Sequence, residues 1–341
     1  MANFKGKTVI VQDWRSINNF QITKLGIAMR RISLIILTGI LIVLTFNCKA
    51  KVNLKTEEGF IDVQGGRIWY SVTGEGTKIP IVMLHGGPGF PSYYLNPLMM
   101  LSEERPIVTY DQLGCGRSDR ITDTTLMTID NYVEQLKQLL SALKIKEFYL
   151  YGHSWGTILG LDYYLKYQKG IKALILASPC INVRLWSNDA DTLISTLPDS
   201  IQFFIKQNMK NIKLDSIKMK EAIDYYYNSF YTRKQPFSAD IDSAHSQLGV
   251  NVYEYMWGKE EFSASGTLKD YDRTGDLNKI KVPTLYITGE FDAARPNTVK
   301  YYQSLTPNSK FIMIRNAGHQ TMHDNPEENI EAIHTFLNNL Q

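Results

Sequence analysis

The sequence is poor in the residues that build disulfide frameworks, zinc sites and nucleic-acid interfaces. Its 341 residues include three cysteines, Cys48, Cys115 and Cys180, which are too few to suggest a disulfide framework. No cluster of His and Cys has the spacing of zinc ligands. The formal net charge is only +3 and no run is rich in Lys and Arg, so we expect no nucleic-acid partner.

The remaining composition is that of an ordinary globular protein. Hydrophobic residues make up 44% of the chain and charged residues 21%, and we find no internal repeat. This length suffices for one large core with an insertion, or for two domains. Nothing in the sequence predicts the oligomeric state.

A pair of arginines and an apolar run stand near the N-terminus. Arg30 and Arg31 precede the largely apolar residues 32–46, and Cys48 follows them. This run is shorter than the roughly 20 residues that a membrane-spanning helix needs, but it suits the apolar region of a secretory signal. If Met29 is the true start, the segment resembles a bacterial lipoprotein signal, in which the cysteine carries lipid and becomes the mature N-terminus.

This resemblance implies an exported protein, anchored to a membrane in the bacterial periplasm or at the cell surface through lipid on Cys48. An uncleaved N-terminal anchor helix is the alternative, and it would also attach the protein to a membrane. We therefore assign residues 1–28 to an upstream extension, 29–48 to the signal or anchor, and 49–58 to a linker.

From Gly59 onward, short apolar segments alternate with helical ones. Such alternation predicts an α/β fold with a mostly parallel, doubly wound sheet. The predicted strands are 60–63, 68–72, 79–84, 106–110, 147–151, 171–177, 282–288 and 311–314.

One long stretch breaks this alternation. Residues 181–275 are helical in pattern, rich in tyrosine, and lack the spacing of strand–helix–strand units. We interpret them as a helical lid inserted after the sixth strand, which leaves 59–180 and 276–341 as the core.

The pentapeptide Gly152-His153-Ser154-Trp155-Gly156 directly follows a predicted strand and opens a helix. A serine in this G-x-S-x-G setting is typical of a nucleophile held on a sharp turn. The helix N-terminus favours negative charge nearby, and the N–H of Trp155 is a candidate oxyanion donor. The sequence therefore predicts Ser154 as a catalytic nucleophile.

A serine hydroxyl needs a base, and the base needs an acid that fixes its tautomer. Asp292 and His319 follow the last two predicted strands, so they share the sheet edge at which Ser154 emerges. We predict that Ser154, Asp292 and His319 form a triad in this chain order. Glu290 and His323 are the competing acid and base.

The segment His85-Gly86-Gly87-Pro88-Gly89 follows the third strand. Two adjacent glycines let backbone N–H groups point at a tetrahedral oxyanion. We predict that Gly87 is the second oxyanion donor beside Trp155, and that Gly86 contacts the substrate.

Three motifs together resemble the proline iminopeptidase family of α/β-hydrolases. They are HGGPG at 85–89, YDQLGCGRSD at 110–119 and GHSWG at 152–156. The resemblance implies an α/β-hydrolase fold and removal of an N-terminal residue, often proline, from short peptides, without a metal or organic cofactor. It also implies that Asp111 and Arg117 are structural rather than catalytic.

In that family, acidic lid residues bind the free α-amine of the substrate, since a buried ammonium needs an opposite charge. Glu261 stands where one such glutamate is expected, although Gly258-Lys259 replaces the usual Gly-Pro before it. A second glutamate is expected in the segment that matches 225–231, which has none. The preference for a free amine is therefore open.

Two other functions also stay open. A small-molecule esterase, lactonase or amidase would use the same triad. A non-catalytic binding protein could use the same scaffold, but the intact set of Ser154, Asp292 and His319 argues against it.

Overall fold

The computed structural model describes residues 52–210, 212 and 214–340. The predicted upstream extension, the signal or anchor, and the lipidation site at Cys48 lie outside these residues. Within the described part of the chain, no helix combines the length and the apolar character needed to cross a membrane.

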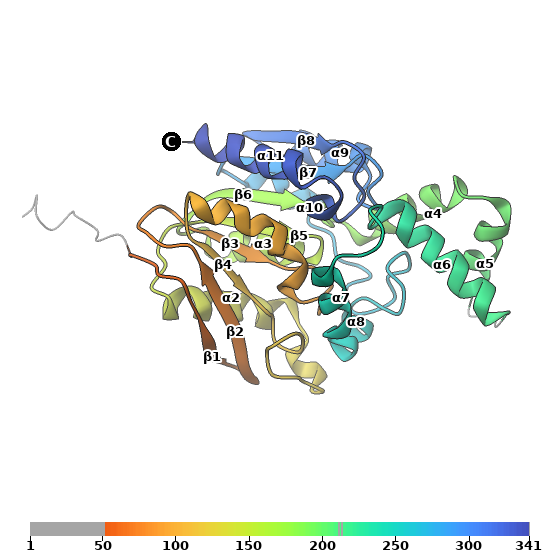
Figure 1. The fold of residues 1–341 in the computed structure, drawn as a ribbon, viewed down its shortest axis with the longest axis horizontal. Helices are drawn as coiled ribbons and strands as arrows, with labels where there is room; N and C mark the ends of the chain where they lie inside the picture. The colour runs from red at the N-terminus through yellow and green to blue at the C-terminus, as the bar shows by residue number, and fades with distance from the viewer. Residues whose placement is uncertain (1–51, 211, 213, 341) are drawn as a thin grey trace, which may run out of the picture. The chain divides into compact units, whose positions relative to one another are not determined.

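Eight strands of the described chain form one sheet, in the order β1-β2-β4-β3-β5-β6-β7-β8 (Figure 1). β1, β2 and β4 pair antiparallel, whereas all pairings from β4 to β8 are parallel. The predicted mostly parallel sheet is thus confirmed. The strands are β1 Glu57–Val63, β2 Gly66–Thr73, β3 Ile81–Leu84, β4 Ile107–Tyr110, β5 Phe148–His153, β6 Ile171–Ala177, β7 Thr284–Gly289 and β8 Ser309–Ile314.

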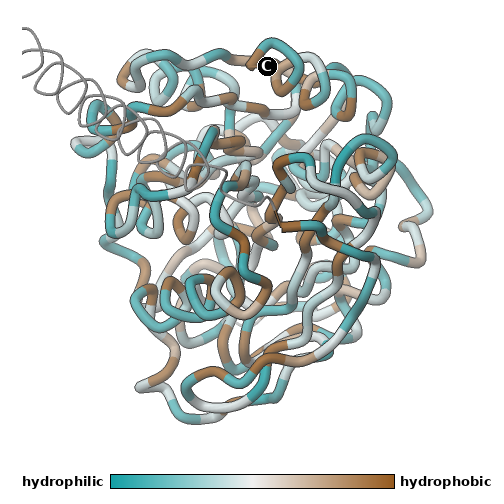
Figure 2. Tube along the Cα trace, turned by 90° about the vertical axis from the view of Figure 1, so that its left-hand side faces the viewer, coloured by the Kyte–Doolittle hydropathy of each residue, from teal (hydrophilic) through white to brown (hydrophobic). Residues whose placement is uncertain are grey.

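The central strands are buried along their whole length. Every residue of β3, β4, β5 and β7 is buried, as continuous apolar runs predict for strands covered on both faces. Figure 2 shows hydrophobic stretches concentrated inside the fold and hydrophilic ones along its outer turns. Removal of these apolar side chains from water is the main favourable contribution to folding.

Helices cover both faces of the sheet. The helices α2 (Ile129–Ala142), α3 (Trp155–Tyr167) and α9 (Pro296–Leu305) belong to the hydrophobic core of one face. The 3-10 helix η1 (Ser92–Glu103) and α11 (Pro326–Asn338) belong to the core of the other. Residues of one strand alternate between these two cores, as the pleat requires.

The last helix, α11, has a clear start signal in its own residues. Asn325 is the N-cap of α11, and its side chain accepts a hydrogen bond from the Glu328 N–H at 3.3 Å. Pro326 takes the first helical position, where its missing N–H costs nothing. Ile333 and Leu337 are buried against the sheet.

A helical insertion separates β6 from β7, as expected after the sixth strand. Figure 1 shows α4, α5 and α6 grouped to one side of the sheet, with α7 and α8 below them. The insertion contains α4 Val183–Ser195, α5 Asp199–Met209, α6 Ser216–Phe230, α7 Ala239–Ser246, α8 Val250–Met256 and the 3-10 helix η3 Thr274–Lys279.

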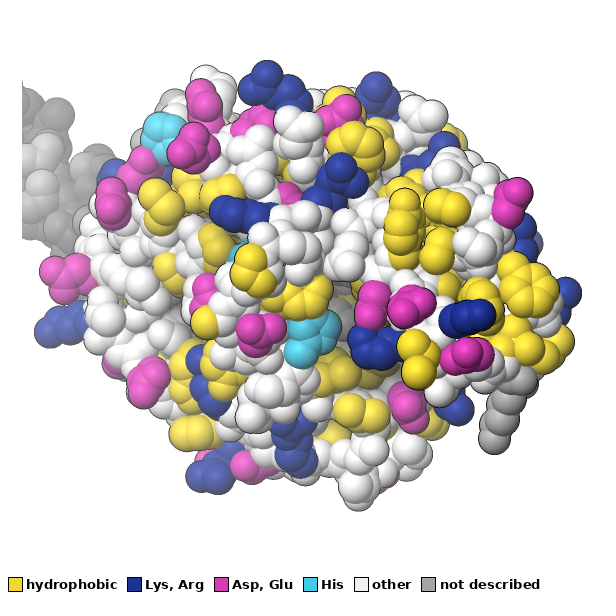
Figure 3. Space-filling view, turned by 45° about the vertical axis from the view of Figure 1, so that its right-hand side comes forward, with side chains coloured by type: hydrophobic (Ala, Val, Ile, Leu, Met, Phe, Trp, Pro, Cys, Tyr) yellow, Lys and Arg dark blue, Asp and Glu magenta, His cyan; other side chains and the backbone are white. Residues whose placement is uncertain are grey.

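The outer part of this lid exposes large apolar side chains. Ile217 is 70% exposed and Phe203 51%, and Tyr225 is also exposed. Figure 3 shows hydrophobic and charged side chains intermixed on this side of the molecule.

The first strand begins earlier than the predicted linker allows. β1 starts at Glu57, and Leu54 is buried and forms an isolated antiparallel bridge with Gly76. The glutamates at the start of β1 mask the strand in the sequence. They are tolerated because β1 is an edge strand whose side chains reach water.

Candidate active site

Ser154 lies in the turn between β5 and α3. Its backbone has φ 54° and ψ −121°, a conformation that side-chain-bearing residues rarely adopt. A Cβ on Gly152 would lie 2.3 Å from the Gly156 carbonyl oxygen, and one on Gly156 would lie 2.3 Å from that of Leu84. Only glycine fits at either position, which is the physical reason for the spacing of the pentapeptide.

The loop after β3 lies against this serine. A Cβ on Gly86 would lie 3.2 Å from the Ser154 Cβ, but the Gly86 N–H already donates to Tyr94 Oη at 2.7 Å. Among the described residues, the N–H groups of Gly87 and Trp155 have no acceptor. Trp155 opens α3, and the first N–H groups of a helix have no partner inside it. Both predicted oxyanion donors are therefore without a competing acceptor among the described residues.

His319 and Asp292 meet at the same edge of the sheet. His319 Nδ1 lies 2.8 Å from Asp292 Oδ1. Asp292 follows β7 and His319 follows β8, and both strands run parallel to β5, which leads into Ser154. The His319 ring lies 4.8 Å, centroid to centroid, from the ring of His153, the residue before Ser154. The structure thus pairs the predicted base with the predicted acid, and it places the base beside the residue that precedes Ser154.

Asp292 is fully buried and held by several donors. Its Oδ2 accepts hydrogen bonds from Ser178 Oγ at 2.6 Å and from the Gly289 N–H at 3.1 Å. Its Oδ1 accepts one from the Ala294 N–H at 2.8 Å. Burial by itself would raise the pKa of Asp292, but His319 and these donors outweigh it and hold that pKa below its ordinary value. The carboxylate is therefore charged at neutral pH and fixes the proton of His319 on Nδ1.

The competing acid and base are engaged elsewhere. Glu290 is exposed and accepts the Asn316 N–H at 2.9 Å. His323 has both ring nitrogens occupied, with Nε2 2.7 Å from the Tyr94 carbonyl oxygen and Nδ1 3.2 Å from Ser238 Oγ. The geometry favours Asp292 and His319 over both.

One glutamine joins three sequence motifs. The Gln112 N–H donates to His85 Nε2 at 2.9 Å, and Gln112 Oε1 accepts from Trp155 Nε1 at 2.8 Å. The loop after β3, the turn after β4 and the serine turn are therefore one hydrogen-bonded unit.

Asp111 and Arg117 anchor this unit. Arg117 Nε donates to Asp111 Oδ2 at 2.7 Å, and Ser92 Oγ donates to Asp111 Oδ1 at 2.7 Å. The guanidinium is sandwiched between the rings of Trp69, at 3.3 Å, and Tyr93, at 4.0 Å. Neither residue contacts Ser154 in these interactions, which agrees with a structural role.

Comparison with known proteins places the chain in a family. The model of the alpha/beta hydrolase fold matches residues 79–326. A proline iminopeptidase of Heyndrickxia coagulans is 41% identical over 286 residues, which cover 83% of this chain and 99% of the relative. The chain belongs to the proline iminopeptidase family of α/β-hydrolases.

Two further members of the proline iminopeptidase family support this assignment. The proline iminopeptidase of Saccharolobus solfataricus is 32% identical over 292 residues, covering 84% of this chain and 94% of the relative. The crystal structure of the Mycobacterium smegmatis proline iminopeptidase matches with a TM-score of 0.79 at 26% identity. This match covers 83% of our chain and 98% of that chain.

Glu261, the residue that the family resemblance singles out in the lid, points away from solvent. The Tyr253 hydroxyl donates to Glu261 Oε2, and Trp186 Nε1 donates to the Glu261 carbonyl oxygen at 3.1 Å. The Trp186 ring, which contacts the Glu261 backbone, lies 5.5 Å from the ring of His319. Burial raises the pKa of Glu261, and Tyr253 and His319 offset only part of this effect.

Aromatic hydroxyls stand where the family resemblance leads one to expect a second lid glutamate. The Tyr231 ring lies 5.0 Å from the His319 ring and 4.9 Å from that of Tyr227. The buried hydroxyls of Tyr226 and Tyr231 have no hydrogen-bond partner within the described residues. This part of the lid carries polar groups without a second charge.

The sequence analysis missed three residues that support the site. Ser178 contacts Asp292, His153 contacts the His319 carbonyl oxygen, and Tyr94 contacts Gly86. Position could have revealed the first two, because Ser178 directly follows β6 at the catalytic edge and His153 precedes the serine. Nothing in the sequence distinguishes Tyr94 from the other buried tyrosines.

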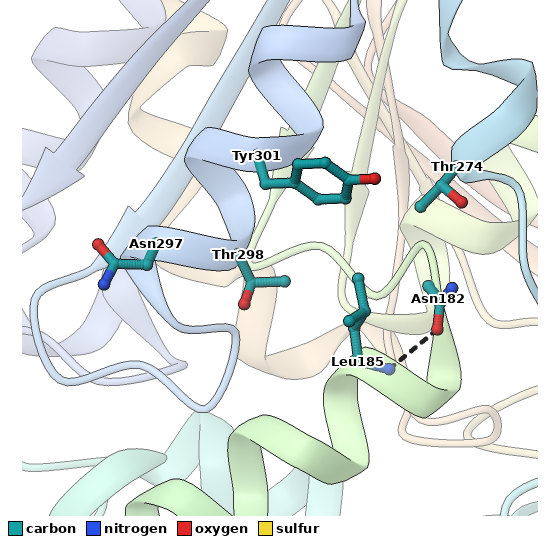
Figure 4. A pocket seen from close by; sticks show the side chains of 6 residues that line it. All are labelled: Asn182, Leu185, Thr274, Asn297, Thr298 and Tyr301. Atoms are coloured by element: carbon teal, nitrogen blue, oxygen red, sulfur yellow. Dashed lines mark hydrogen bonds between the residues drawn. The ribbon is translucent and has the colours of Figure 1, made fainter.

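A pocket of about 440 Å³ lies apart from these residues, between the start of α4, η3 and α9 (Figure 4). None of the predicted site residues lines it. Its lining side chains are mostly small and polar, namely those of Asn182, Leu185, Thr274, Asn297, Thr298 and Tyr301.

Proposed function

We propose that this protein is a serine peptidase that releases an N-terminal residue, often proline, from short peptides through an acyl-enzyme. The observation that carries the proposal is the hydrogen bond between His319 and Asp292 beside Ser154, in a chain of the proline iminopeptidase family. Ser154 is the nucleophile, His319 the base and Asp292 the acid that orients it.

The geometry supports a specific order of proton movements. Because the Nδ1 proton of His319 is held by Asp292, the other ring nitrogen, Nε2, is the one that takes the Ser154 proton. The serine oxygen attacks the carbonyl carbon of the first residue, and the oxyanion binds the N–H groups of Gly87 and Trp155. Each such donor typically contributes roughly 3 kcal/mol of transition-state stabilisation.

His319 then returns the proton to the leaving amine as the bond to the second residue breaks. Water enters in place of that amine, loses a proton to His319 and attacks the acyl-enzyme. Collapse of the second tetrahedral intermediate frees the N-terminal residue and restores the proton to Ser154.

Glu261 is the proposed binding group for the substrate's α-amine. Of the two buried carboxylates on the described lid residues, Asp189 is paired with Arg295 at 3.1 Å, which leaves Glu261 for an incoming ammonium. The charge of that ammonium favours the ionised form of Glu261 despite the burial. The Tyr231 ring lies 5.0 Å from the His319 ring, and its buried hydroxyl has no partner among the described residues, so it is available to the same substrate group. This arrangement would restrict cleavage to the first residue.

The experiment that tests the function compares three substrates on purified protein. These are a proline arylamide, its N-acetylated form and a short-chain aryl ester, each also measured with Ser154→Ala. Fast turnover of the free proline arylamide alone supports the peptidase. Equal turnover of free and N-acetylated arylamides, or turnover of the ester alone, replaces it with the second candidate.

That second candidate is a small-molecule esterase or amidase. One observation favours it, which is that tyrosines rather than a second carboxylate line the lid next to His319. A site with one charge binds a free amine less tightly than a site with two, and accepts uncharged substrates more readily.

We also propose that the protein is exported and attached to a membrane through lipid on Cys48. Support comes only from the sequence, where Arg30 and Arg31, the apolar run 32–46 and Cys48 follow one another.

A further inference from the structure

A continuous series of hydrogen bonds connects the loop after β3, called here the oxyanion loop (85–89), to the backbone of His319. The segment around His319 after β8 is called the base loop. The Gly86 N–H donates to Tyr94 Oη at 2.7 Å, and Tyr94 Oη lies 3.0 Å from His153 Nδ1. His153 Nε2 lies 2.9 Å from the backbone carbonyl oxygen of His319. The chain passes beside Ser154, because His153 directly precedes it.

The direction of every bond in this chain is determined by chemistry. A carbonyl oxygen only accepts, so the proton of His153 is on Nε2. Burial lowers the pKa of His153 to about 3, so its ring is neutral and Nδ1 has no proton. Tyr94 must therefore donate its only proton to Nδ1, and it accepts the Gly86 N–H with a lone pair.

His153 is the donor on which the His319 carbonyl oxygen depends. Ser178 Oγ is also within reach of that oxygen, at 3.0 Å, but it lies 2.6 Å from the charged carboxylate of Asp292. A hydroxyl has one proton, and the shorter bond to a charged acceptor is the stronger. Ser178 therefore donates its proton to Asp292, and His153 is the donor to the His319 carbonyl oxygen.

We propose that Tyr94 and His153 are positioning residues that fix the oxyanion loop and the base loop relative to each other. This inference rests on the proposed function of Gly87 and His319. Neither Tyr94 nor His153 touches the reacting atoms. A break at either residue lets the two loops move independently, so that the oxyanion donors and the base no longer align in one transition state.

Neighbouring residues hold Tyr94 and His153 in place. The His323 ring holds the Tyr94 backbone carbonyl at 2.7 Å, so the tyrosine is anchored at both ends. The ionisable groups that act on His153 are His319, Asp292 and His323, and the two histidines oppose its protonation whereas Asp292 favours it. Burial outweighs the attraction of Asp292, and the neutral ring follows.

A double-mutant cycle tests the positioning role. Tyr94→Phe removes one hydroxyl, His153→Leu removes both ring contacts, and the double variant combines them. We expect kcat to fall roughly 10- to 100-fold in each single variant, with KM changed less than about threefold. The kcat of the double variant should be little lower than that of the less active single variant, because one break already disconnects the two loops.

Two further variants separate positioning from mere stability. His153→Gln places an amide N–H where Nε2 stood, so it should recover part of the kcat lost in His153→Leu at a similar Tm. Tyr286→Phe is the matched control, since Tyr286 is equally buried in β7 and its hydroxyl lies 2.7 Å from Thr306 Oγ1. It should lower Tm and leave kcat unchanged.

Multiplicative losses in the double variant, or a Tyr94→Phe kcat like that of Tyr286→Phe, would overturn the positioning role. A readout independent of turnover is the nitrogen NMR spectrum of His153, which should show a neutral ring protonated on Nε2 between pH 7 and 5. A charged ring or the other tautomer also overturns the inference. A wild-type protein that hydrolyses no substrate refutes the proposed function, and the NMR spectrum still decides the chain of hydrogen bonds.

Discussion

Ser178 Oγ lies 2.6 Å from Asp292 Oδ2, so the residue directly after β6 supports the carboxylate that follows β7. Ser178 has φ 47°, a backbone conformation that costs energy for a residue with a side chain. The lid begins at residue 181, a short distance further along the chain. The orientation of the acid is therefore coupled to the point at which the lid joins the core.

Replacement of Ser154 by alanine should abolish turnover without unfolding the protein. The loss of the nucleophile typically lowers kcat by about a millionfold, and the turn geometry does not need the hydroxyl. Steady-state kinetics with a thermal melt checks this prediction. Activity close to that of the wild type would show that another nucleophile acts.

Substitutions of the acid and the base should reduce activity far more than substitutions of the neighbouring acid and histidine. We expect Asp292→Asn to lower kcat about ten-thousandfold and His319→Ala to lower it further, because the proton of His319 is then misplaced or absent. Glu290→Gln should stay active, and His323→Ala should lose far less activity than His319→Ala, because the ring nitrogens of His323 contact the Tyr94 backbone and Ser238. Kinetics of all four variants on one substrate decides, and an inactive Glu290→Gln beside an active Asp292→Asn reverses the assignment.

Glu261→Gln should weaken catalysis selectively for substrates with a free amine. The variant leaves the ammonium unpaired in a buried site, so kcat/KM for a free arylamide should fall at least tenfold, while that for an uncharged aryl ester changes little. Glu260→Gln is the control, because Glu260 is the adjacent acid. Equal losses on both substrates would point to damage to the lid instead.

The stability of the protein should fall with acidification partly through His153. The pKa of this ring is about 3 in the folded state and about 6.5 in the unfolded chain, so below pH 6.5 the unfolded state binds one more proton. The contribution is complete above pH 6.5 and is lost progressively towards pH 3, by about 2 kcal/mol at pH 5.

Urea unfolding at pH 7.5 and pH 5 measures this effect. His153→Gln should be less stable than the wild type at pH 7.5 but should lose about 2 kcal/mol less on acidification, because glutamine does not titrate. Parallel pH dependence of the two proteins would place the acid sensitivity elsewhere.

The mature native protein should begin at Cys48 and carry lipid. The basis is the order of charged pair, apolar run and cysteine near the N-terminus. Mass spectrometry of the N-terminal peptide from the membrane fraction tests this. An intact chain with an unmodified Cys48 would indicate an anchor helix.

The sequence predicted the parts of the site that depend on local pattern. Ser154, Asp292 and His319 stand at strand ends with recognisable spacing, and parallel strands bring such ends together. Glycine spacing likewise pointed to Gly87, because a tight turn requires glycine at particular positions and this requirement is visible in the sequence.

The supporting contacts left no such trace. Tyr94 and His153 are 59 positions apart, and their hydrogen bond depends on how η1 packs against the sheet. Glu57 and Glu58 concealed the start of β1, because an edge strand tolerates charge that a buried one excludes. These features depend on packing between distant parts of the chain, which local sequence periodicity does not predict.

The depth of the catalytic residues determines what can reach them. Ser154 is 5% exposed, His319 3% and Glu261 8%. A folded protein cannot present an internal peptide bond to a serine so deeply enclosed, whereas the loose end of a short chain can thread inward. Under the proposed function, the rate of product formation follows the number of free chain ends that endoproteases have already made, not the mass of protein present.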